Sequence, residues 1–200
     1  VSKAHGKIAW FTGDVALPDY VDTPRLLEDG FQTIAGVFSA DAADPASQLL
    51  LSVLPNLNGV VADLGAGWGY LTRKLSDMPT KRVIAVEADR RALDMAKVNV
   101  PSANVEFVWA DATKWRSNDA LDTVVMNPPF HNFGKADPEI GVAFMKSAAG
   151  SLKSQGDCYI VANRHLPYEQ PLSELFQNVS EVIKDNRFKV LYASKPKRKV

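Results

Sequence analysis

From residue 60 onward, short runs of β-branched and aliphatic residues alternate with longer amphipathic stretches. The apolar runs predict strands at 60–64, 82–87, 105–109, 121–126, 157–162, 181–184 and 188–193, and the stretches between them predict helices at 70–77, 90–100, 138–152 and 168–177. A parallel pair of strands needs a long crossover connection, so this alternation is typical of a parallel sheet. We therefore expect an α/β fold with helices on both faces of the sheet.

The last two expected strands break the alternation. Only a few residues around Asn186 separate them, too few for a crossover helix, so the two strands should pair as an antiparallel hairpin. The prediction is a seven-stranded, Rossmann-like sheet that is parallel except for one antiparallel strand near its edge. A plain dinucleotide-binding fold lacks such a final hairpin.

The length of 200 residues suits one catalytic domain, which we expect at 44–200. Residues 1–43 are interpreted as a connecting segment because prolines interrupt them. Within this segment, 8–11 suggests a strand, and 31–38 suggests a strand or hairpin.

Several classes of protein are excluded by composition and pattern. The apolar runs are far shorter than the ~20 residues of a membrane-spanning helix, so no membrane partner is expected. No secretory signal is visible, and the protein is expected to be cytoplasmic. The single cysteine, Cys158, opens an apolar run and is interpreted as a buried structural thiol. No metal site is expected.

Charge is balanced over the chain but not along it. The formal net charge is zero, which argues against a protein held to nucleic acid by a global positive field. Basic side chains gather near the carboxyl end, where Asp185 is their acidic neighbour: Lys184, Arg187, Lys189, Lys195, Lys197, Arg198 and Lys199. This cluster is either a solvated tail or a local RNA contact, and the sequence leaves both readings open.

A glycine-rich turn, Asp63-Leu-Gly-Ala-Gly-Trp-Gly69, directly follows the first buried strand and precedes a helix. Glycine tolerates positive φ and lets a ligand approach the backbone closely. The spacing is G-x-G-x-G, whereas a pyrophosphate is held by G-x-G-x-x-G. The pattern favours S-adenosyl-L-methionine, which has no phosphate, and gives Asp63, Gly65, Ala66, Gly67 and Gly69 as cofactor-binding residues.

Two acidic residues end the next strands. Glu87 lies ~20 residues beyond the turn, where a carboxylate can accept both ribose hydroxyls, and Ala88 follows it. Asp111 is placed to accept a hydrogen bond from the adenine amine, with Ala112 offering a backbone N–H. A helix-capping or turn aspartate explains Asp111 equally well.

Asn127-Pro128-Pro129-Phe130 follows the fourth strand and so falls at the same edge of the sheet as the glycine turn. An exocyclic amine on a nucleobase is a poor nucleophile, because its lone pair is delocalised into the ring. The Asn127 side-chain oxygen and the Pro128 carbonyl can accept the two amine hydrogens and hold the nitrogen for in-line displacement. The prolines stiffen the loop, and Phe130 offers a face for an extruded base.

No general base is required, because the amine proton becomes strongly acidic after methyl transfer. His131 beside this loop is interpreted as either a substrate contact or a simple turn residue. Asn163, Arg164 and Tyr168 follow the fifth strand at the same edge and are expected to line the substrate entrance. His165 lies in the same segment and is interpreted, like His131, as either a substrate contact or a simple turn residue.

Together these residues resemble the bacterial ribosomal RNA guanine-N2 methyltransferases of the RsmC and RlmG type, within the methyltransferase small domain superfamily. The motifs that carry the resemblance follow the family's order and lie at Gly36–Ser39, Asp44–Leu51, Asp63–Gly69, Asn127–His131, Val161–Leu166 and Asn186–Lys189. The resemblance implies the class I methyltransferase fold, S-adenosylmethionine as cofactor, and ribosomal RNA or a ribosomal subunit as partner. It also implies that the segment before the first strand closes over the cofactor, with contacts from Phe38, Ser47 and Gln48.

Family members usually carry an N-terminal RNA-binding domain, which 200 residues do not accommodate. The chain is therefore either a catalytic-domain fragment or the product of a shorter lineage. Ala162–Leu166 resembles the large-subunit enzymes and Leu166–Glu169 the small-subunit ones, so the ribosomal subunit stays open. Between 42 and 47 the chain departs from the small-subunit pattern.

Three other functions are compatible with parts of this pattern. The N-P-P motif also serves methyltransferases that act on adenine N6 or on a protein glutamine. A nicotinamide-dependent oxidoreductase shares the fold class, although the glycine spacing argues against it. A non-catalytic RNA-binding module with a vestigial pocket is the third, and the intact Asn127 loop argues against that reading.

Overall fold

The computed structural model describes residues 2–3, 6–7, 12–13, 23–129, 131–132, 135–136 and 138–197. The strand expected at 8–11 lies outside these residues. Among the described residues, three hairpins of two-residue strands lie outside the main sheet. They pair β1 (Ser2–Lys3) with β2 (Gly6–Lys7), β3 (Arg25–Leu26) with β4 (Gln32–Thr33), and β9 (His131–Asn132) with β10 (Lys135–Ala136).

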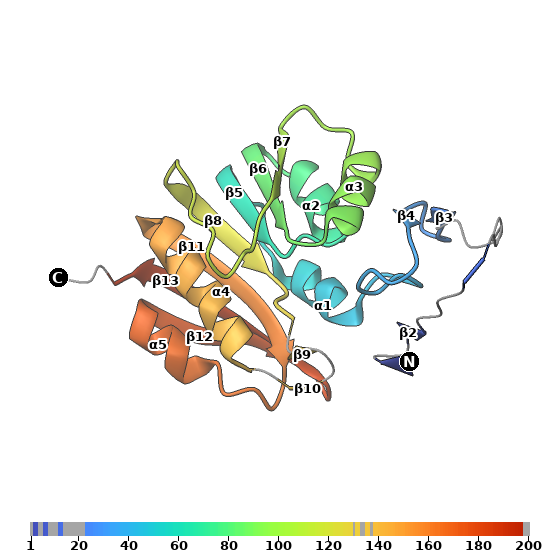
Figure 1. Ribbon diagram of the computed structural model, residues 1–200. Helices are drawn as coiled ribbons and strands as arrows, with labels where there is room; N and C mark the ends of the chain where they lie inside the picture. The colour runs from blue at the N-terminus through green and yellow to red at the C-terminus, as the bar shows by residue number, and fades with distance from the viewer. Residues whose placement is uncertain are drawn as a thin grey trace.

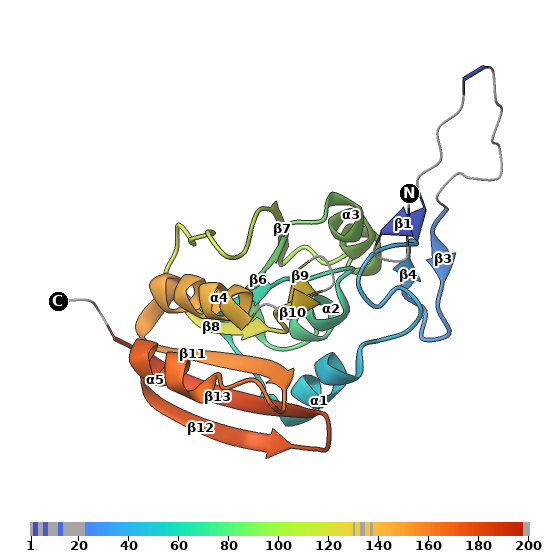
Figure 2. The same cartoon turned by 60° about the horizontal axis from the view of Figure 1, so that its bottom comes forward.

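The main sheet has seven strands in the order β12-β13-β11-β8-β5-β6-β7 (Figure 1). Their bounds are β5 (Gly59–Leu64), β6 (Thr80–Glu87), β7 (Val105–Trp109), β8 (Leu121–Met126), β11 (Leu152–Asn163), β12 (Phe176–Lys184) and β13 (Phe188–Pro196). β13 runs antiparallel to both of its neighbours, and the other strands are mutually parallel. The expected sheet and its final hairpin are confirmed, and β11, β13 and β12 succeed one another at one end of it (Figure 2).

Helices cover both faces of the sheet, as expected. Alternate residues of β5 point to opposite sides, because Val61 packs with α1 (Pro45–Val53) and α2 (Tyr70–Ser76), whereas Ala62 packs with α4 (Pro138–Ser151) and α5 (Glu169–Leu175). α3 (Arg90–Asn99) packs beside α2 and against β6 and β7. Cys158 is fully buried in the α4 side of the core, in agreement with a structural thiol.

Helix α1 was not expected from the apolar pattern, although its start carries a clear signal. Asp44 caps it by accepting a hydrogen bond from the Ser47 backbone N–H at 2.9 Å, and Pro45 occupies the first helical turn. Both residues are favoured at a helix start. The Asp44 side chain satisfies a backbone N–H that has no partner within the helix, and proline has no backbone N–H that would need one. The helix buries Ala46, Ser47 and Leu50, which fixes the Asp44 end against the sheet.

The segment before α1 docks on the glycine turn. Its hairpin of β3 (Arg25–Leu26) and β4 (Gln32–Thr33) confirms part of the strand expected at 31–38. Asn99 of α3 donates to the backbone carbonyls of both Gln32, at 2.8 Å, and Trp68, at 2.7 Å. The Phe31 ring lies 5.2 Å from the Trp68 ring, centroid to centroid. The division at 43/44 stays a prediction.

None of the described helices has both the length and the apolar character needed to cross a membrane.

Candidate active site

The glycine turn and the Asn127 loop leave the sheet side by side. Leu64 at the end of β5 pairs with Met126 at the end of β8, and on its other side with Val86 of β6. The residues that follow, Gly65 and Asn127, are therefore neighbours at one edge. The chain order reverses between β5 and β8, and such a switch point opens a crevice at the carboxyl ends of parallel strands.

The turn is braced by the neighbouring strand β6. Gly65 and Ala66 both donate their backbone N–H groups to the Val86 carbonyl, at 2.9 and 3.0 Å. One carboxylate oxygen of Glu87 accepts from the Gly67 N–H and the other from the Asp89 N–H, each at 2.8 Å. Because each oxygen has a further lone pair, the same carboxylate can still accept hydroxyl donors from a ribose.

Asp63 lies fully buried immediately before the turn. Thr72 donates its hydroxyl to Asp63 Oδ2 at 2.6 Å, whereas Asp63 Oδ1 has no hydrogen-bond partner among the described residues. Burial raises the pKa of Asp63 to about 7, Thr72 opposes that shift, and the charge of Glu87 adds to it. A buried carboxylate with an unpaired oxygen favours a cationic ligand nearby, which suits a sulfonium.

Two cavities meet at this edge. The first, of about 40 Å³, adjoins the glycine turn and is lined by Phe38, Ser39, Asp44, Ser47, Gly65, Ala66, Gly67, Trp68, Tyr70, Leu71 and Asn127. The second, of about 630 Å³, is lined by Phe38, Asp44, Ala46, Asn127, Pro128, Ala162, Asn163, His165, Leu166, Tyr168, Asn186, Arg187 and Phe188. Phe38, Asp44 and Asn127 line both, so these three residues form the boundary between the two cavities.

The two cavities differ in what they can hold. The larger one has the size of a nucleoside site, whereas the first holds little more than one water molecule. A cofactor must therefore extend along the open rim or displace Phe38, whose side chain is largely exposed. The Phe38 backbone is tied to the turn, because Trp68 donates its indole N–H to the Phe38 carbonyl at 3.0 Å.

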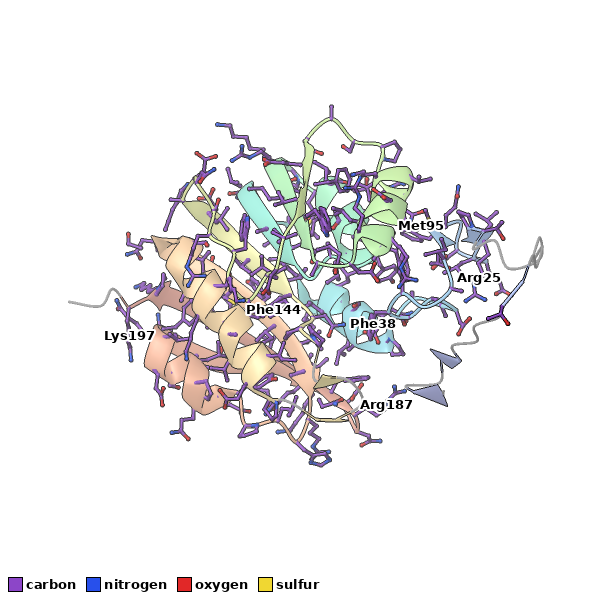
Figure 3. All side chains as sticks on the ribbon, viewed as in Figure 1. Arg25, Phe38, Met95, Phe144, Arg187 and Lys197 are labelled. Atoms are coloured by element: carbon purple, nitrogen blue, oxygen red, sulfur yellow. The ribbon has the colours of Figure 1, made fainter. Side chains whose placement is uncertain are left out.

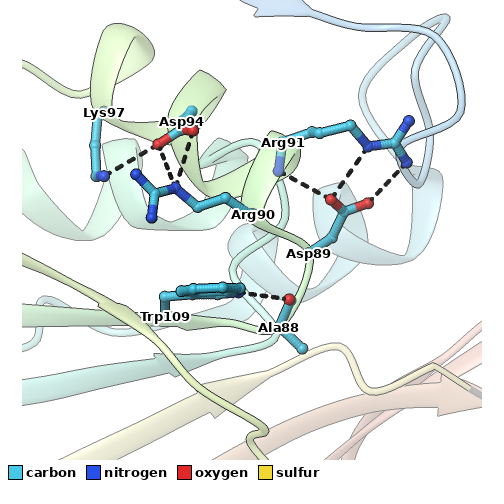
Figure 4. Close-up of polar contacts among 7 residues, drawn as sticks. All are labelled: Ala88, Asp89, Arg90, Arg91, Asp94, Lys97 and Trp109. Atoms are coloured by element: carbon cyan, nitrogen blue, oxygen red, sulfur yellow. Dashed lines mark hydrogen bonds and ion pairs between the residues drawn. The ribbon is translucent and has the colours of Figure 1, made fainter.

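The rim beyond Glu87 is held by a network of polar contacts (Figure 4). Trp109 donates its indole N–H to the Ala88 carbonyl at 2.9 Å, and the Arg90 guanidinium lies 5.4 Å from the Trp109 ring centroid. Arg90 and Lys97 both pair with Asp94. Ala88 is thereby fixed beside Glu87, at the place expected for a cofactor contact.

Asp111 follows β7 at the same edge but is occupied locally. Its Oδ1 accepts from the Thr113 backbone N–H at 2.9 Å and from the Thr113 hydroxyl at 2.6 Å, and these bonds lower the pKa of its carboxyl group. Ala112 is buried. Neither residue lines the two cavities, so the turn-forming reading of Asp111 has direct geometric support.

Several expected site residues do not reach the cavities. Gln48 instead donates its side-chain amide to the Ala43 carbonyl at 3.1 Å and lines a separate hollow. Arg164 is exposed, and its backbone N–H bonds the Arg187 carbonyl at 2.8 Å. Pro129 is exposed too. These placements arise because adjacent residues of a turn or helix face different directions, which a motif does not reveal.

The structure does bring Asn163 and His165 into the larger cavity, as expected. Phe130 and the His131 side chain lie outside the described residues. The hairpin turn between β12 and β13 adds Asn186 and Arg187, which the sequence interpretation had not assigned to the site. Asp44 is a further residue missed there.

The basic cluster near the carboxyl end does not form one surface. Arg187 and Lys197 lie at opposite ends of β13 (Figure 3). Lys189 is buried and paired with Glu169 at 2.5 Å. Only the Arg187 end borders the larger cavity, so a single basic tail at the active edge is ruled out for the described part of this cluster.

Two glycines of the turn should respond differently to alanine. Gly69 has φ of +93°, and an added Cβ would lie 3.1 Å from the Ala96 Cα, so Gly69→Ala is expected to lower the free energy of unfolding by about 2–3 kcal/mol. Gly67 has φ of +56° with open space around its Cβ, so Gly67→Ala should cost about 1 kcal/mol.

Urea unfolding measures these costs, and calorimetry with S-adenosylhomocysteine measures binding. We expect Gly67→Ala to lose more affinity than its small instability explains, because Gly67 lines the cavity where the cofactor is expected and the new methyl group would take up space there. Equal losses in the free energy of unfolding for Gly69→Ala and Gly67→Ala would contradict the different surroundings assigned to these two glycines.

The sequence matches the family model of the methyltransferase small domain over residues 28–192. The chain belongs to this family. As a methyltransferase small domain, it carries the glycine turn and the Asn127 loop on one edge of the sheet, within the matched range.

Named relatives of this methyltransferase small domain are similar over most of its length. A ribosomal RNA small subunit methyltransferase C from Shewanella loihica is 32% identical over 179 residues, which cover 88% of this chain and 52% of that protein. The protein of the same name from Klebsiella pneumoniae is 35% identical over 162 residues, covering 80% and 47%. The chain spans about half the length of these relatives.

A solved structure supports the same family assignment. The 16S rRNA N2 methyltransferase of T. thermophilus, in complex with AdoMet and guanosine, is 33% identical with a TM-score of 0.72. The match covers 88% of this chain and 50% of that one. The Rossmann-like sheet with its final hairpin is thus the fold of a known methyltransferase.

Proposed function

We propose that this domain transfers a methyl group from S-adenosylmethionine to the exocyclic N2 amine of guanine in ribosomal RNA. The observation that carries the proposal is the shared wall of the two cavities, where Asn127 separates the glycine turn from a nucleoside-sized site. Similarity to a guanine-N2 methyltransferase solved with AdoMet and guanosine supports the choice of base.

The chain's own groups fit the cofactor. Glu87 can accept the ribose hydroxyls, the Gly65–Gly67 backbone allows close approach, and buried Asp63 favours a positive charge above the turn. When bound, the cofactor supplies an electrophilic methyl on a sulfonium. Ser47 and Phe38 line the cavity at the turn and are proposed cofactor neighbours, whereas Gln48 is not included.

On the base side, Asn127 Oδ1 and the Pro128 carbonyl are proposed to accept the two hydrogens of the amine. Holding both hydrogens directs the nitrogen lone pair toward the methyl group, so the displacement runs in line. The amine proton leaves to water after transfer, and no buried base is needed. Asn163, His165 and Arg187 line the cavity that would hold the nucleotide.

The proposal is tested by incubating the protein with methyl-labelled cofactor and, separately, small subunits, large subunits, naked ribosomal RNA, DNA and a release factor. Nucleosides from each labelled product are identified by mass spectrometry. We expect N2-methylguanosine in ribosomal RNA. Label in release factor alone, or as N6-methyladenosine, would establish one of the alternative amine acceptors instead.

Two further outcomes would overturn the proposal. Binding of RNA and S-adenosylhomocysteine without label transfer to any acceptor would identify a vestigial module. Tight NAD binding without S-adenosylhomocysteine binding would overturn the cofactor assignment.

A further inference from the structure

An asparagine that must accept hydrogen bonds from an amine faces a problem of orientation. The carboxamide of Asn127 has an acceptor oxygen and a donor NH₂ group of nearly equal size, and a half-turn about its last side-chain bond exchanges them. In the exchanged orientation, N–H groups would face the amine hydrogens of the base. Donors would then oppose donors, and the site would repel the group it has to hold.

Two residues of α1 contact the amide of Asn127 on its nitrogen side. Nδ2 lies 2.8 Å from Asp44 Oδ2 and 2.9 Å from Ser47 Oγ. The two amide hydrogens therefore meet two oxygen acceptors. Because the amide is planar, Oδ1 faces away from α1.

The chemistry of Asp44 selects this orientation. An ionised carboxylate can only accept hydrogen bonds, so exchanging the amide would set Oδ1 against a negative oxygen and leave Nδ2 without these partners. A charged acceptor also polarises the amide and makes its oxygen a stronger acceptor.

Asp44 is itself held rigidly. The oxygen that contacts Asn127 also caps α1 by accepting from the Ser47 N–H at 2.9 Å, and a helix N-terminus favours a negative charge. The helix is anchored through Leu50, which is fully buried. A fixed element 83 residues away in sequence thus sets the orientation of Asn127.

We infer that Asp44 and Ser47 are positioning residues that hold the Asn127 amide with Oδ1 directed to the substrate amine. This inference rests on the proposed function and deepens it. Neither residue is assigned chemistry with the base, and both act through Asn127.

The test uses variants that keep the helix cap. Asp44→Ser retains a capping hydroxyl but removes the carboxylate, and Ser47→Ala removes the second acceptor. We expect Asp44→Ser to lower kcat by about tenfold or more, with the dissociation constant for S-adenosylhomocysteine within about threefold of wild type. Ser47→Ala, at a residue that also borders the cofactor cavity, should lower kcat by severalfold. Ser52→Ala, an exposed serine on the same helix, is the matched control and should leave kcat unchanged.

A double-mutant cycle separates positioning from a structural role. If Asp44 acts through Asn127, Asp44→Ser should have almost no further effect on kcat in an Asn127→Ala background. Multiplying effects in the double variant would overturn the inference, as would lost cofactor affinity with unchanged kcat.

A spectroscopic readout is independent of turnover. The side-chain NH₂ resonances of Asn127 are assigned by their loss in Asn127→Ala. They should exchange with solvent more slowly in the wild type than in Asp44→Ser, and equal rates would contradict the contact. If the proposed function itself is wrong, the wild-type protein will methylate no guanine, which distinguishes that failure from failure of the positioning inference.

Discussion

Replacing Asn127 with alanine is expected to lower the rate of methyl transfer by two or more orders of magnitude, on the order of 3 kcal/mol of transition-state stabilisation. The variant loses the acceptor that orients the amine, but it leaves the glycine turn and Glu87 in place. Single-turnover kinetics with labelled cofactor measure the rate of the chemical step. Calorimetry with S-adenosylhomocysteine should show retained binding.

The matched control for this variant is Asn178→Ala. Asn178 lies on β12, away from the active edge, where its amide donates to Ser194 Oγ at 3.1 Å. Its removal should leave turnover near that of the wild type. Near-normal turnover by Asn127→Ala itself would refute the mechanism.

Asp63→Asn is expected to change the pH dependence of stability strongly. Burial raises the folded-state pKa of Asp63 to about 7, well above the usual value for an aspartate. A carboxyl group whose pKa is raised by folding stabilises the folded state fully at any pH below its unfolded-state pKa. That contribution is lost as the pH rises through the folded-state pKa of about 7. Between pH 5 and pH 8 the variant should therefore gain about 3 kcal/mol relative to wild type in the free energy of unfolding.

Urea unfolding at the two pH values measures this difference. The difference between the two proteins isolates Asp63 from other carboxyls, such as Asp111, whose pKa is lowered and whose contribution has the opposite sign. Thr72→Val is the second comparison. It removes the hydroxyl that donates a hydrogen bond to Asp63 but keeps the Asp63 carboxyl group itself. A pH-independent difference between wild type and Asp63→Asn would contradict the buried, titrating carboxyl.

The same carboxyl should link cofactor binding to pH. A sulfonium nearby favours the ionised form, so wild-type affinity for S-adenosylmethionine is expected to fall as the pH drops below about 7. S-adenosylhomocysteine lacks that charge and should show a weaker dependence. Asp63→Asn should lose the pH dependence together with part of its affinity for the cationic cofactor.

The succession of strands along the chain and the position of both motifs could be predicted from sequence, because each rests on local periodicity and on strand ends. The carboxyl ends of parallel strands share one edge, which is enough to bring Gly65 and Asn127 together. The final hairpin followed from the short connection around Asn186.

Side-chain direction could not be predicted in the same way. Ser47 and Gln48 are adjacent in the sequence, yet one contacts Asn127 and the other bonds Ala43. Helix α1 could not be predicted from periodicity because its leucines at 49–51 are consecutive, so the cap at Asp44 is its only clear local signal. The contact between Asp44 and Asn127 joins residues far apart in the chain, and only the packing of α1 on the sheet creates it.

The most direct test of the account is a crystal structure of this chain with S-adenosylhomocysteine and guanosine bound together. The account predicts the guanine N2 amine within about 3.2 Å of both Asn127 Oδ1 and the Pro128 carbonyl, with its nitrogen facing the cofactor sulfur. A guanosine bound elsewhere, or a cofactor on the far side of Asn127 from the glycine turn, would contradict it.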